Sequence, residues 1–284
     1  MAINLAEKYS QKVQERFTIG SKTDRYCGHD YEFTGVKTIK IYSVDTVPTT
    51  NYTRTGTARF GALTELGDTT QEMTLAVDKA FTFSIDAGNA SEQFNIKQAN
   101  KCLKREIDEV ITPEIDKYRF EKWIAGNGLT KGKSVLTSKD GVLTKTNIVE
   151  KIFTANATMS DEKVPTTGRV LFIPELTFLK FKLADVVMGG SDTLTAENIR
   201  RGYRGTIDGV DVVTVPSSIF PADTNFILKY KGATVDVMKL KNYRVHKNPM
   251  GVDGDVVEGR YIYDSFVLDT KCKGIYVSST ATSA

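Results

Sequence analysis

Two strand-like segments separated by a long polar stretch constrain this chain more than any other feature. In "GVKTIKIYSV" (35–44) and "KAFTFSID" (79–86), apolar and polar side chains alternate, which is the pattern of a half-buried β-strand. The stretch from Pro48 to Gln71 between them is polar and rich in Thr and Gly. We therefore expect a hairpin arm in which residues 36–47 pair with residues 72–86, with strands about 40 Å long. An isolated two-stranded ribbon of this kind is marginally stable in water, so the arm needs a surface to pack against.

A long amphipathic helix is expected directly after the arm. Asn89 and Glu92 have the spacing of a capping box, and apolar residues then recur at intervals of three and four until Gly126. The pattern predicts a helix over residues 89–125, on the order of 55 Å long. Pro113 lacks a backbone donor and crowds the preceding turn, so we expect a kink or a break there.

The middle of the chain mixes helices with a buried strand. A helix is expected to start at Thr144 as N-cap and to run to about Ala157, with Leu143 and Ile148 placed as a hydrophobic staple. "RVLFIP" predicts a short buried strand that ends at Pro174. The helix expected next carries leucines at helical spacing, at positions Leu176, Leu179 and Leu183.

The remainder of the chain is mostly β. Asp208-Gly209 and Lys231-Gly232 each separate two alternating runs, which predicts two hairpins. Residues 259–278 predict a final strand, turn and strand. Several helices before several strands, without regular βαβ alternation, favour an α+β fold.

Composition excludes few classes of protein. The 284 residues are 40% hydrophobic and 26% charged, which allows a substantial core, and the net charge of +3 is too small to indicate a protein that coats nucleic acid. We see neither a signal peptide nor a run long enough to cross a bilayer, so we expect cytoplasmic synthesis and no membrane partner. Cys27, Cys102 and Cys272 are odd in number and far apart, which indicates free thiols.

Motifs for catalysis are weak, and we expect no cofactor and no metal site. Cys27 and His29 place a thiol and a base in one short segment, so a thiol enzyme stays as an alternative. A solvated loop pair is the simpler interpretation, because rigid positioning is difficult next to an N-terminal arm. "GLTKGKS" (128–134) fails the Walker A spacing because Asn127 occupies the place of the first glycine, so a surface turn is expected.

Basic residues are interpreted mainly as interface or plain surface. Two clusters combine basic side chains with an aromatic residue, a pattern that single-stranded nucleic acid also favours. They are Arg200, Arg201 and Arg204 around Tyr203, and Lys239, Lys241, Arg244 and Lys247 around Tyr243. The better candidates for a weak contact with a genome lie in the N-terminal arm, at Lys8, Lys12 and Arg16.

Several dispersed segments are similar to those of one structural family. "IYSVDTVPTTNYTRTGTARFGALTELGDTTQEMTL", "FTFSIDAGN", "EIDEVITPEIDKYR", "GTIDGVDVVTVP" and "VEGRYIYDSFVLDTKCKGIYV" resemble segments of the HK97-like major capsid proteins of tailed bacteriophages. The order of elements, with an arm, a long hairpin, a long helix and a mixed domain, is similar as well. The resemblance covers nearly the whole chain.

The resemblance implies an α+β HK97-like capsid fold and a division of the chain. The expected parts are an N-terminal arm (1–30), an E-loop hairpin (31–88), a P-domain spine helix (89–126), an A-domain with part of the P-domain (127–254) and C-terminal P-domain strands (255–284). In this family the E-loop lies across a neighbouring subunit. The surface that the hairpin needs is then another copy of the chain.

The resemblance also implies a function and partners. The chain would self-assemble as hexamers and pentamers into an icosahedral shell around double-stranded DNA, located in the virion after assembly in the host bacterial cytoplasm. It would be no enzyme, and scaffolding, portal and decoration proteins would be its partners. An encapsulin-like nanocompartment shell is a second alternative. We expect inter-subunit contacts at the hairpin end, through Arg54, Arg59, Phe60, Glu65 and Asp68.

Overall fold

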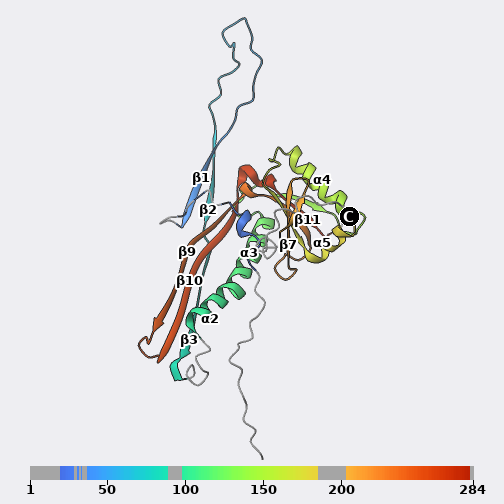
Figure 1. Ribbon diagram of the computed structural model, residues 1–284. Helices are drawn as coiled ribbons and strands as arrows, with labels where there is room; N and C mark the ends of the chain where they lie inside the picture. The colour runs from blue at the N-terminus through green and yellow to red at the C-terminus, as the bar shows by residue number, and fades with distance from the viewer. Residues whose placement is uncertain are drawn as a thin grey trace, which may run out of the picture.

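The chain folds into a projecting hairpin, a three-stranded sheet backed by a long helix, and a six-stranded sheet (Figure 1). This computed structural model describes residues 20–28, 31, 33, 37–88, 98–184 and 203–281. The hairpin points away from the rest of the molecule, at the end opposite the free end of the three-stranded sheet (Figure 1). Within the described residues, no helix has the length and apolar character needed to cross a membrane.

The hairpin consists of β1 (Thr38–Val44) and β2 (Asp68–Thr74), which pair antiparallel. The prediction that the second strand extends to residue 86 is wrong, because β3 (Val77–Asp86) leaves the hairpin and pairs with β10 (Gly254–Val267). The exchange occurs at Ala76, whose N–H donates to Asp264 Oδ2 at 2.8 Å. The apolar residues of β3 thereby reach a buried surface inside their own subunit, which the hairpin does not offer.

One face of the three-stranded sheet, in the order β3-β10-β9, is covered by the long helix. The outer strand β9 spans Thr234–Lys247. The helix consists of α2 (Ala99–Glu106), a π-helical turn (Ile107–Ile111) and α3 (Thr112–Ala125). The irregular turn directly precedes Pro113, which sits in the first turn of α3, so the predicted irregularity takes the form of a π-helical turn and the helix does not break.

Gly126 ends this helix as predicted, in the left-handed conformation with φ of 63°. The predicted cap at Asn89 lies outside the described residues. Helix and sheet meet through Ile111 and Ile115, which pack against Tyr261 and Tyr263 of β10.

The six-stranded sheet has helices on both faces. Its order is β4-β11-β8-β5-β7-β6. The strands are β4 (Leu136–Lys139), β5 (Arg169–Pro174), β6 (Tyr203–Ile207), β7 (Val210–Val215), β8 (Thr224–Tyr230) and β11 (Ile275–Ser279). Every residue of β5 is buried, as its continuous apolar sequence predicts.

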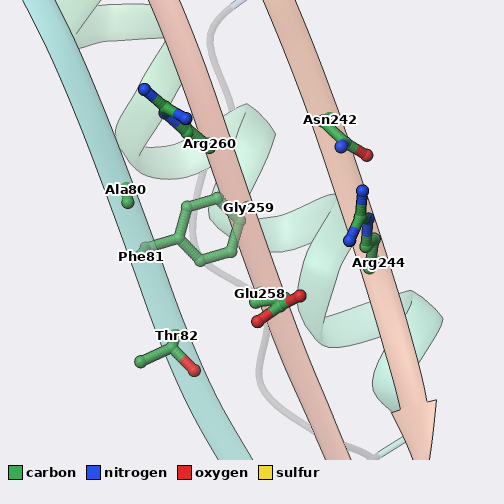
Figure 2. A pocket seen from close by; sticks show the side chains of 8 residues that line it. All are labelled: Ala80, Phe81, Thr82, Asn242, Arg244, Glu258, Gly259 and Arg260. Atoms are coloured by element: carbon green, nitrogen blue, oxygen red, sulfur yellow. The ribbon is translucent and has the colours of Figure 1, made fainter.

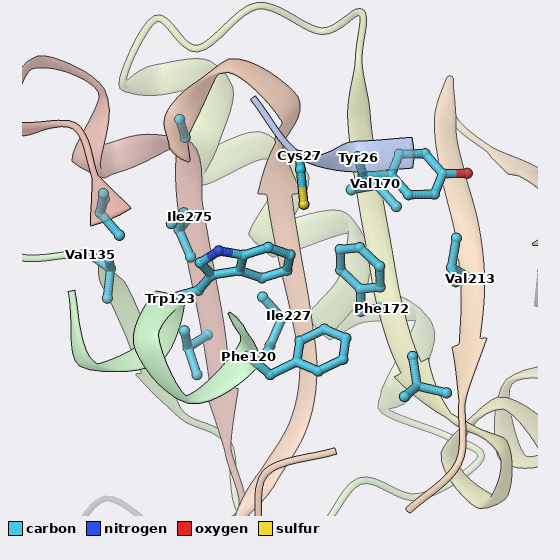
Figure 3. Packing of buried hydrophobic residues seen from close by; sticks show 14 of the residues in the cluster. Tyr26, Cys27, Phe120, Trp123, Val135, Val170, Phe172, Val213, Ile227 and Ile275 are labelled. Carbon is cyan, nitrogen blue, oxygen red and sulfur yellow. The ribbon is translucent and has the colours of Figure 1, made fainter. Parts of the chain in front are cut away.

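Alternate residues of β5 serve the two sides of this sheet. Phe172 packs with Phe120 and Trp123 of α3 (Figure 3). Leu171 and Ile173 pack in the cluster formed with α4 (Ile148–Asp161) and α5 (Glu175–Lys182). The layered core therefore joins the long helix to the six-stranded sheet.

Helix α4 begins at Ile148, so the predicted start at Thr144 is wrong, as is the end near Ala157. Asn147 Oδ1 accepts from the Thr144 N–H at 2.7 Å, which closes a turn in front of the helix instead. Leu143 and Ile148 nevertheless pack in one buried cluster, in keeping with the expected apolar pair.

Helix α5 is confirmed, but phenylalanines form its buried stripe. Phe178 and Phe181 are buried, whereas the predicted leucines are exposed, with Leu176 70% exposed. Both stripes are apolar at helical spacing, so the sequence alone does not say which of them faces the core. The leucine stripe, comprising Leu176, Leu179 and Leu183, stays uncovered within the described subunit.

Of the later β predictions, the first hairpin is confirmed. β6 and β7 pair antiparallel around Asp208 and Gly209, whose φ values of 49° and 75° fit a tight primed turn. The second predicted hairpin is wrong, because β8 and β9 lie in different sheets and Lys231–Ala233 forms a 3-10 turn between them. The predicted final strand, turn and strand are confirmed as β10, a 3-10 turn at Asp269–Gly274 and β11, and the two strands lie in different sheets.

Candidate assembly surfaces

Residues 45–67 join β1 to β2 and form what we call the hairpin tip. In the described chain, its backbone hydrogen bonds stay within the tip, for example from the Thr53 N–H to the Arg59 oxygen at 3.0 Å and from the Gly61 N–H to the Ala58 oxygen at 3.1 Å. Figure 1 shows the tip extended far from both sheets. Its conformation is therefore set locally, and its side chains are exposed.

The tip exposes large apolar side chains. Phe60 is 86% exposed and stands edge-on to Tyr52, with ring centroids 5.1 Å apart. Soluble monomers rarely leave contiguous apolar surface uncovered. The other exposed apolar residues of the tip are Val47, Leu63 and Leu66. Apolar residues in a loop between two strands are a sequence signal for a contact surface, and here they accompany the charged residues predicted above.

Most of the predicted contact residues lie in the tip. Arg54, Arg59, Phe60 and Glu65 are all exposed there, and Arg59 Nε donates to the Gly56 oxygen at 3.1 Å. Asp68 is the exposed first residue of β2 and belongs to the paired stem. The structure thus brings four of the five predicted residues together in the tip.

Gln71 fixes the base of the hairpin to the body. Its side chain is buried, and Nε2 donates to the backbone oxygens of Val267 at 2.7 Å and Gly128 at 2.8 Å. Oε1 accepts from the Asp269 N–H at 3.0 Å. Met73, on the same face of β2, packs in a cluster shared with β9 and β10. The stem is therefore held rigidly, while the tip is free of the body.

A buried polar network fixes the segment 20–28 against α3. Asp116 accepts from Ser21 Oγ at 2.9 Å and from the Lys22 N–H at 2.7 Å. Arg119 donates to Thr23 Oγ at 2.9 Å. These contacts join residues far apart in sequence and position the end of the N-terminal region beside the long helix.

A buried ion pair lies next to this segment. Lys229 Nζ lies 4.0 Å from Asp236 Oδ2, donates to the Tyr26 oxygen at 2.7 Å and lies 4.0 Å above the Trp123 ring. Burial lowers the pKa of Lys229. Burial alone would raise the pKa of Asp236, but Lys229, Arg119 and hydrogen bonds from hydroxyl groups outweigh it and hold that pKa below its usual range.

The thiol-enzyme alternative fails at Cys27. The thiol is buried and donates to the Thr23 oxygen at 3.2 Å, and burial raises its pKa well above the ordinary range. A nucleophile needs an accessible thiolate, which this environment disfavours. His29 lies outside the described residues. In the described part of the chain, no three His, Cys, Asp or Glu side chains gather as a metal site would require.

The remaining predicted features are structural or lie outside the described residues. The turn "GLTKGKS" is held to the body through the Thr130 N–H, which donates to Asp269 Oδ1 at 2.9 Å. Arg204 pairs with Glu175 at 2.9 Å, while Arg200 and Arg201 are not described. On β9, Lys241, Arg244 and Lys247 are exposed. The candidate genome contacts Lys8, Lys12 and Arg16 also lie outside the described residues.

The face of the three-stranded sheet that points away from the helix carries a shallow hollow of about 460 Å³ over Gly259 (Figure 2). On its β9 side lie Asn242 and Arg244, and on its β3 side the small residues Ala80 and Thr82. Glu258 and Arg260 of β10 complete the lining, together with Phe81, whose ring packs on the helix side of the sheet. The face is otherwise polar, so it is a second candidate surface for contacts between subunits.

The chain is similar to known proteins in structure, but not significantly in sequence. No protein-family model matches the chain, and no curated protein is significantly similar to it. A structure described as Mycobacterium phage Che8 has a TM-score of 0.75 at 17% identity, covering 99% of this chain and 100% of that chain. The capsid structure of cyanophage P-SCSP1u has a TM-score of 0.72 at 12% identity, covering 98% and 93%.

A third structure agrees with these two. The asymmetric unit of the mature capsid of bacteriophage PhiM1 has a TM-score of 0.68 at 12% identity, with 98% of this chain and 92% of that chain covered. Full-length similarity at such low identity is a statement about the fold, and it includes the projecting hairpin and both sheets. The chain therefore has the α+β HK97-like fold that its sequence resemblance predicted, the fold found in these phage capsid structures.

Proposed function

We propose that this chain is a major capsid protein, which assembles as hexamers and pentamers into an icosahedral head shell around double-stranded DNA. One observation carries the proposal: a rigidly held hairpin presents an exposed apolar tip whose backbone hydrogen bonds, among the described residues, stay within the tip. A monomer gains nothing from such a projection, whereas a shell subunit gains a contact with its neighbour. The HK97-like fold is consistent with this role.

In this proposal the hairpin is the E-loop and the long helix is the spine helix of the P-domain. The three-stranded sheet belongs to the P-domain and the six-stranded sheet to the A-domain, within the boundaries 1–30, 31–88, 89–126, 127–254 and 255–284. The N-terminal residues Lys8, Lys12 and Arg16 are proposed to face the DNA. Arg54, Arg59, Phe60, Glu65 and Asp68 are proposed to contact a neighbouring subunit.

The proposed place of action is the virion capsid, after synthesis in the host bacterial cytoplasm. Scaffolding, portal and decoration proteins are proposed partners, and the role is structural and not enzymatic. The buried Cys27 thiol supports this exclusion of thiol catalysis. An encapsulin-like shell would differ by packaging a protein cargo instead of DNA.

Truncation of the tip tests the proposal. Residues 46–66 are replaced by a short Gly-Ser turn, which removes the tip and keeps the paired stem of β1 and β2. We expect the free energy of unfolding to change by less than about 1 kcal/mol, because the tip's backbone hydrogen bonds stay within the tip in the described part of the chain and loop shortening alters closure entropy only slightly. Shells observed by electron microscopy should disappear.

A matched control keeps the length of the tip and replaces its side chains by Gly and Ser. Loss of shells in both variants would show that the tip side chains make the contact. Loss in the truncation alone would show that assembly depends on the length of the hairpin. Normal shells from both variants would contradict the role of the tip. A parent chain that stays monomeric at every concentration would contradict the shell function itself.

A further inference from the structure

The hollow over Gly259 is produced by two ion pairs that lean away from each other. Arg260 Nε and Nη2 donate to the two carboxylate oxygens of Asp78, at 3.0 and 2.6 Å. Glu258 Oε1 lies 2.8 Å from His246 Nε2, towards the other end of the sheet. Gly259 lies between them on β10 (Figure 2), and its side-chain position faces the helix, as those of its partners Phe81 and Tyr243 do, so the open centre of the outer face comes from the spread of the two ion pairs.

Packing on the helix side requires the glycine. A Cβ atom at position 259 would lie 2.3 Å from Phe81 Cε1 and 2.7 Å from Tyr243 Cδ1, closer than atoms approach in proteins. These two aromatic residues are the cross-strand partners of Gly259 on either side. The glycine therefore lets the two rings close over β10 on the helix side, while the hollow lies on the opposite face of the strand.

The tip of the same subunit does not reach this hollow. Gln71 holds the hairpin at Val267, which lies eight positions along β10 from Gly259, or about 26 Å of strand. From that point the hairpin runs in the opposite direction (Figure 1). The tip can therefore fill this hollow only from a second copy of the chain.

The tip and the hollow are chemically complementary. Phe60 projects from the tip with Tyr52 against its ring, and Arg59 is its sequence neighbour. The hollow offers the guanidinium groups of Arg244 and Arg260, which attract an aromatic face, and the Glu258 carboxylate, which attracts Arg59. Because a cavity of about 150 Å³ holds benzene, the hollow has room for a phenyl ring.

We propose that Phe60 of one subunit inserts into the hollow over Gly259 of a second copy, between Arg244 and Arg260. This proposal rests on the proposed shell function and names the surface on which the tip docks. The hairpin tip of one subunit then packs on the outer face of the three-stranded sheet of its neighbour.

Disulfide trapping tests the contact. One chain carries Phe60→Cys and a second carries Ala80→Cys, both with Cys102→Ser, because the other two cysteines are buried. The two chains are mixed, assembled and oxidised, and the products are separated on a non-reducing gel. A disulfide requires Cα atoms within about 7 Å, so only a docked tip forms it efficiently. The control pairs Phe60→Cys with Ala157→Cys, an equally exposed alanine on α4.

We expect shells, with a dimer band for the 60/80 pair at least tenfold stronger than for the 60/157 pair. Phe60→Ala should raise the protein concentration needed for assembly by about tenfold, and Phe60→Tyr by much less. Shells of parent chains without enrichment of the 60/80 dimer would overturn the docking surface and leave the shell function standing. Parent chains that form no shells would overturn the proposed function and the contact with it.

Discussion

Gln71 offers the most direct test of how the hairpin is held. Its amide is 6% exposed and bonds to three backbone groups from two separate segments, at Gly128, Val267 and Asp269. Gln71→Glu keeps the size of the side chain and removes both donated hydrogen bonds. Gln71→Ala removes all three bonds together with the packing of the side chain.

The expected loss follows from the groups left behind. A buried acceptor that loses its donor costs about 1–3 kcal/mol, and two carbonyl oxygens lose theirs in either variant. The Asp269 N–H is partly buried and recovers part of its loss from water. We therefore expect each variant to lower the free energy of unfolding by about 3 kcal/mol. For a slope near 3 kcal/mol per molar urea, the midpoint falls by about 1 M.

Urea unfolding of the unassembled subunit measures this change, with Thr70→Ala as control. Thr70 is the exposed neighbour on β2, and a substitution there should stay within about 0.5 kcal/mol. Hydrogen exchange adds a local measurement, since the amides of β2 should exchange faster in both Gln71 variants than in the control. A loss below 0.5 kcal/mol for Gln71→Ala, with unchanged exchange in β2, would refute the view that this amide holds the hairpin.

Two further substitutions test the interior. The pKa of Asp236 is lowered in the folded state, so its stabilising contribution is present above its unfolded pKa near 3.9 and is lost as the pH falls through the folded pKa. Asp236→Asn should lower the free energy of unfolding by about 3 kcal/mol at pH 7, because Lys229 loses its buried counter-charge. The variant should also lose less stability than the parent below pH 4. An unchanged pH profile in denaturant titrations would contradict the pairing. Gly259→Ala should lower the free energy of unfolding by about 1–3 kcal/mol through the clash with Phe81. Gly20→Ala is the control, because no atom lies within 4 Å of its Cβ, and it should leave thermal unfolding unchanged. Equal effects of the two substitutions would contradict the packing of Phe81 and Tyr243 around Gly259.

Local signals in the sequence predicted many elements correctly. Gly126 ends the long helix because only glycine adopts the left-handed cap without strain, and Asp208-Gly209 encodes its turn directly. Pro113 marks the irregular turn for an equally local reason. Each of these predictions depends on the conformational preference of one or two residues, which needs no knowledge of the rest of the fold.

The wrong predictions have a common physical origin, which is the choice of the strand that each strand pairs with. β3 has the alternation of a hairpin strand, and nothing in its residues says that β10 replaces β1 as its neighbour. Lys231-Gly232 resembles a hairpin turn, yet the flanking strands enter different sheets. Period-two patterns define which face of a strand is apolar, whereas pairing is decided by the sum of contacts across the whole molecule.

The same reasoning connects the candidate surfaces to the sequence. Phe60 was predicted as a contact residue together with charged neighbours, while the hollow over Gly259 has no sequence signal, because it arises from three strands meeting in register. Helix α5 is apolar on two sides, and the core uses only Phe178 and Phe181. Leu176 and Leu179 form a second apolar side that the described subunit leaves exposed, and we propose it as a further surface for contact between subunits. Apolar residues that stay exposed once the subunit core is complete are therefore the positions where we expect a second copy of the chain to pack.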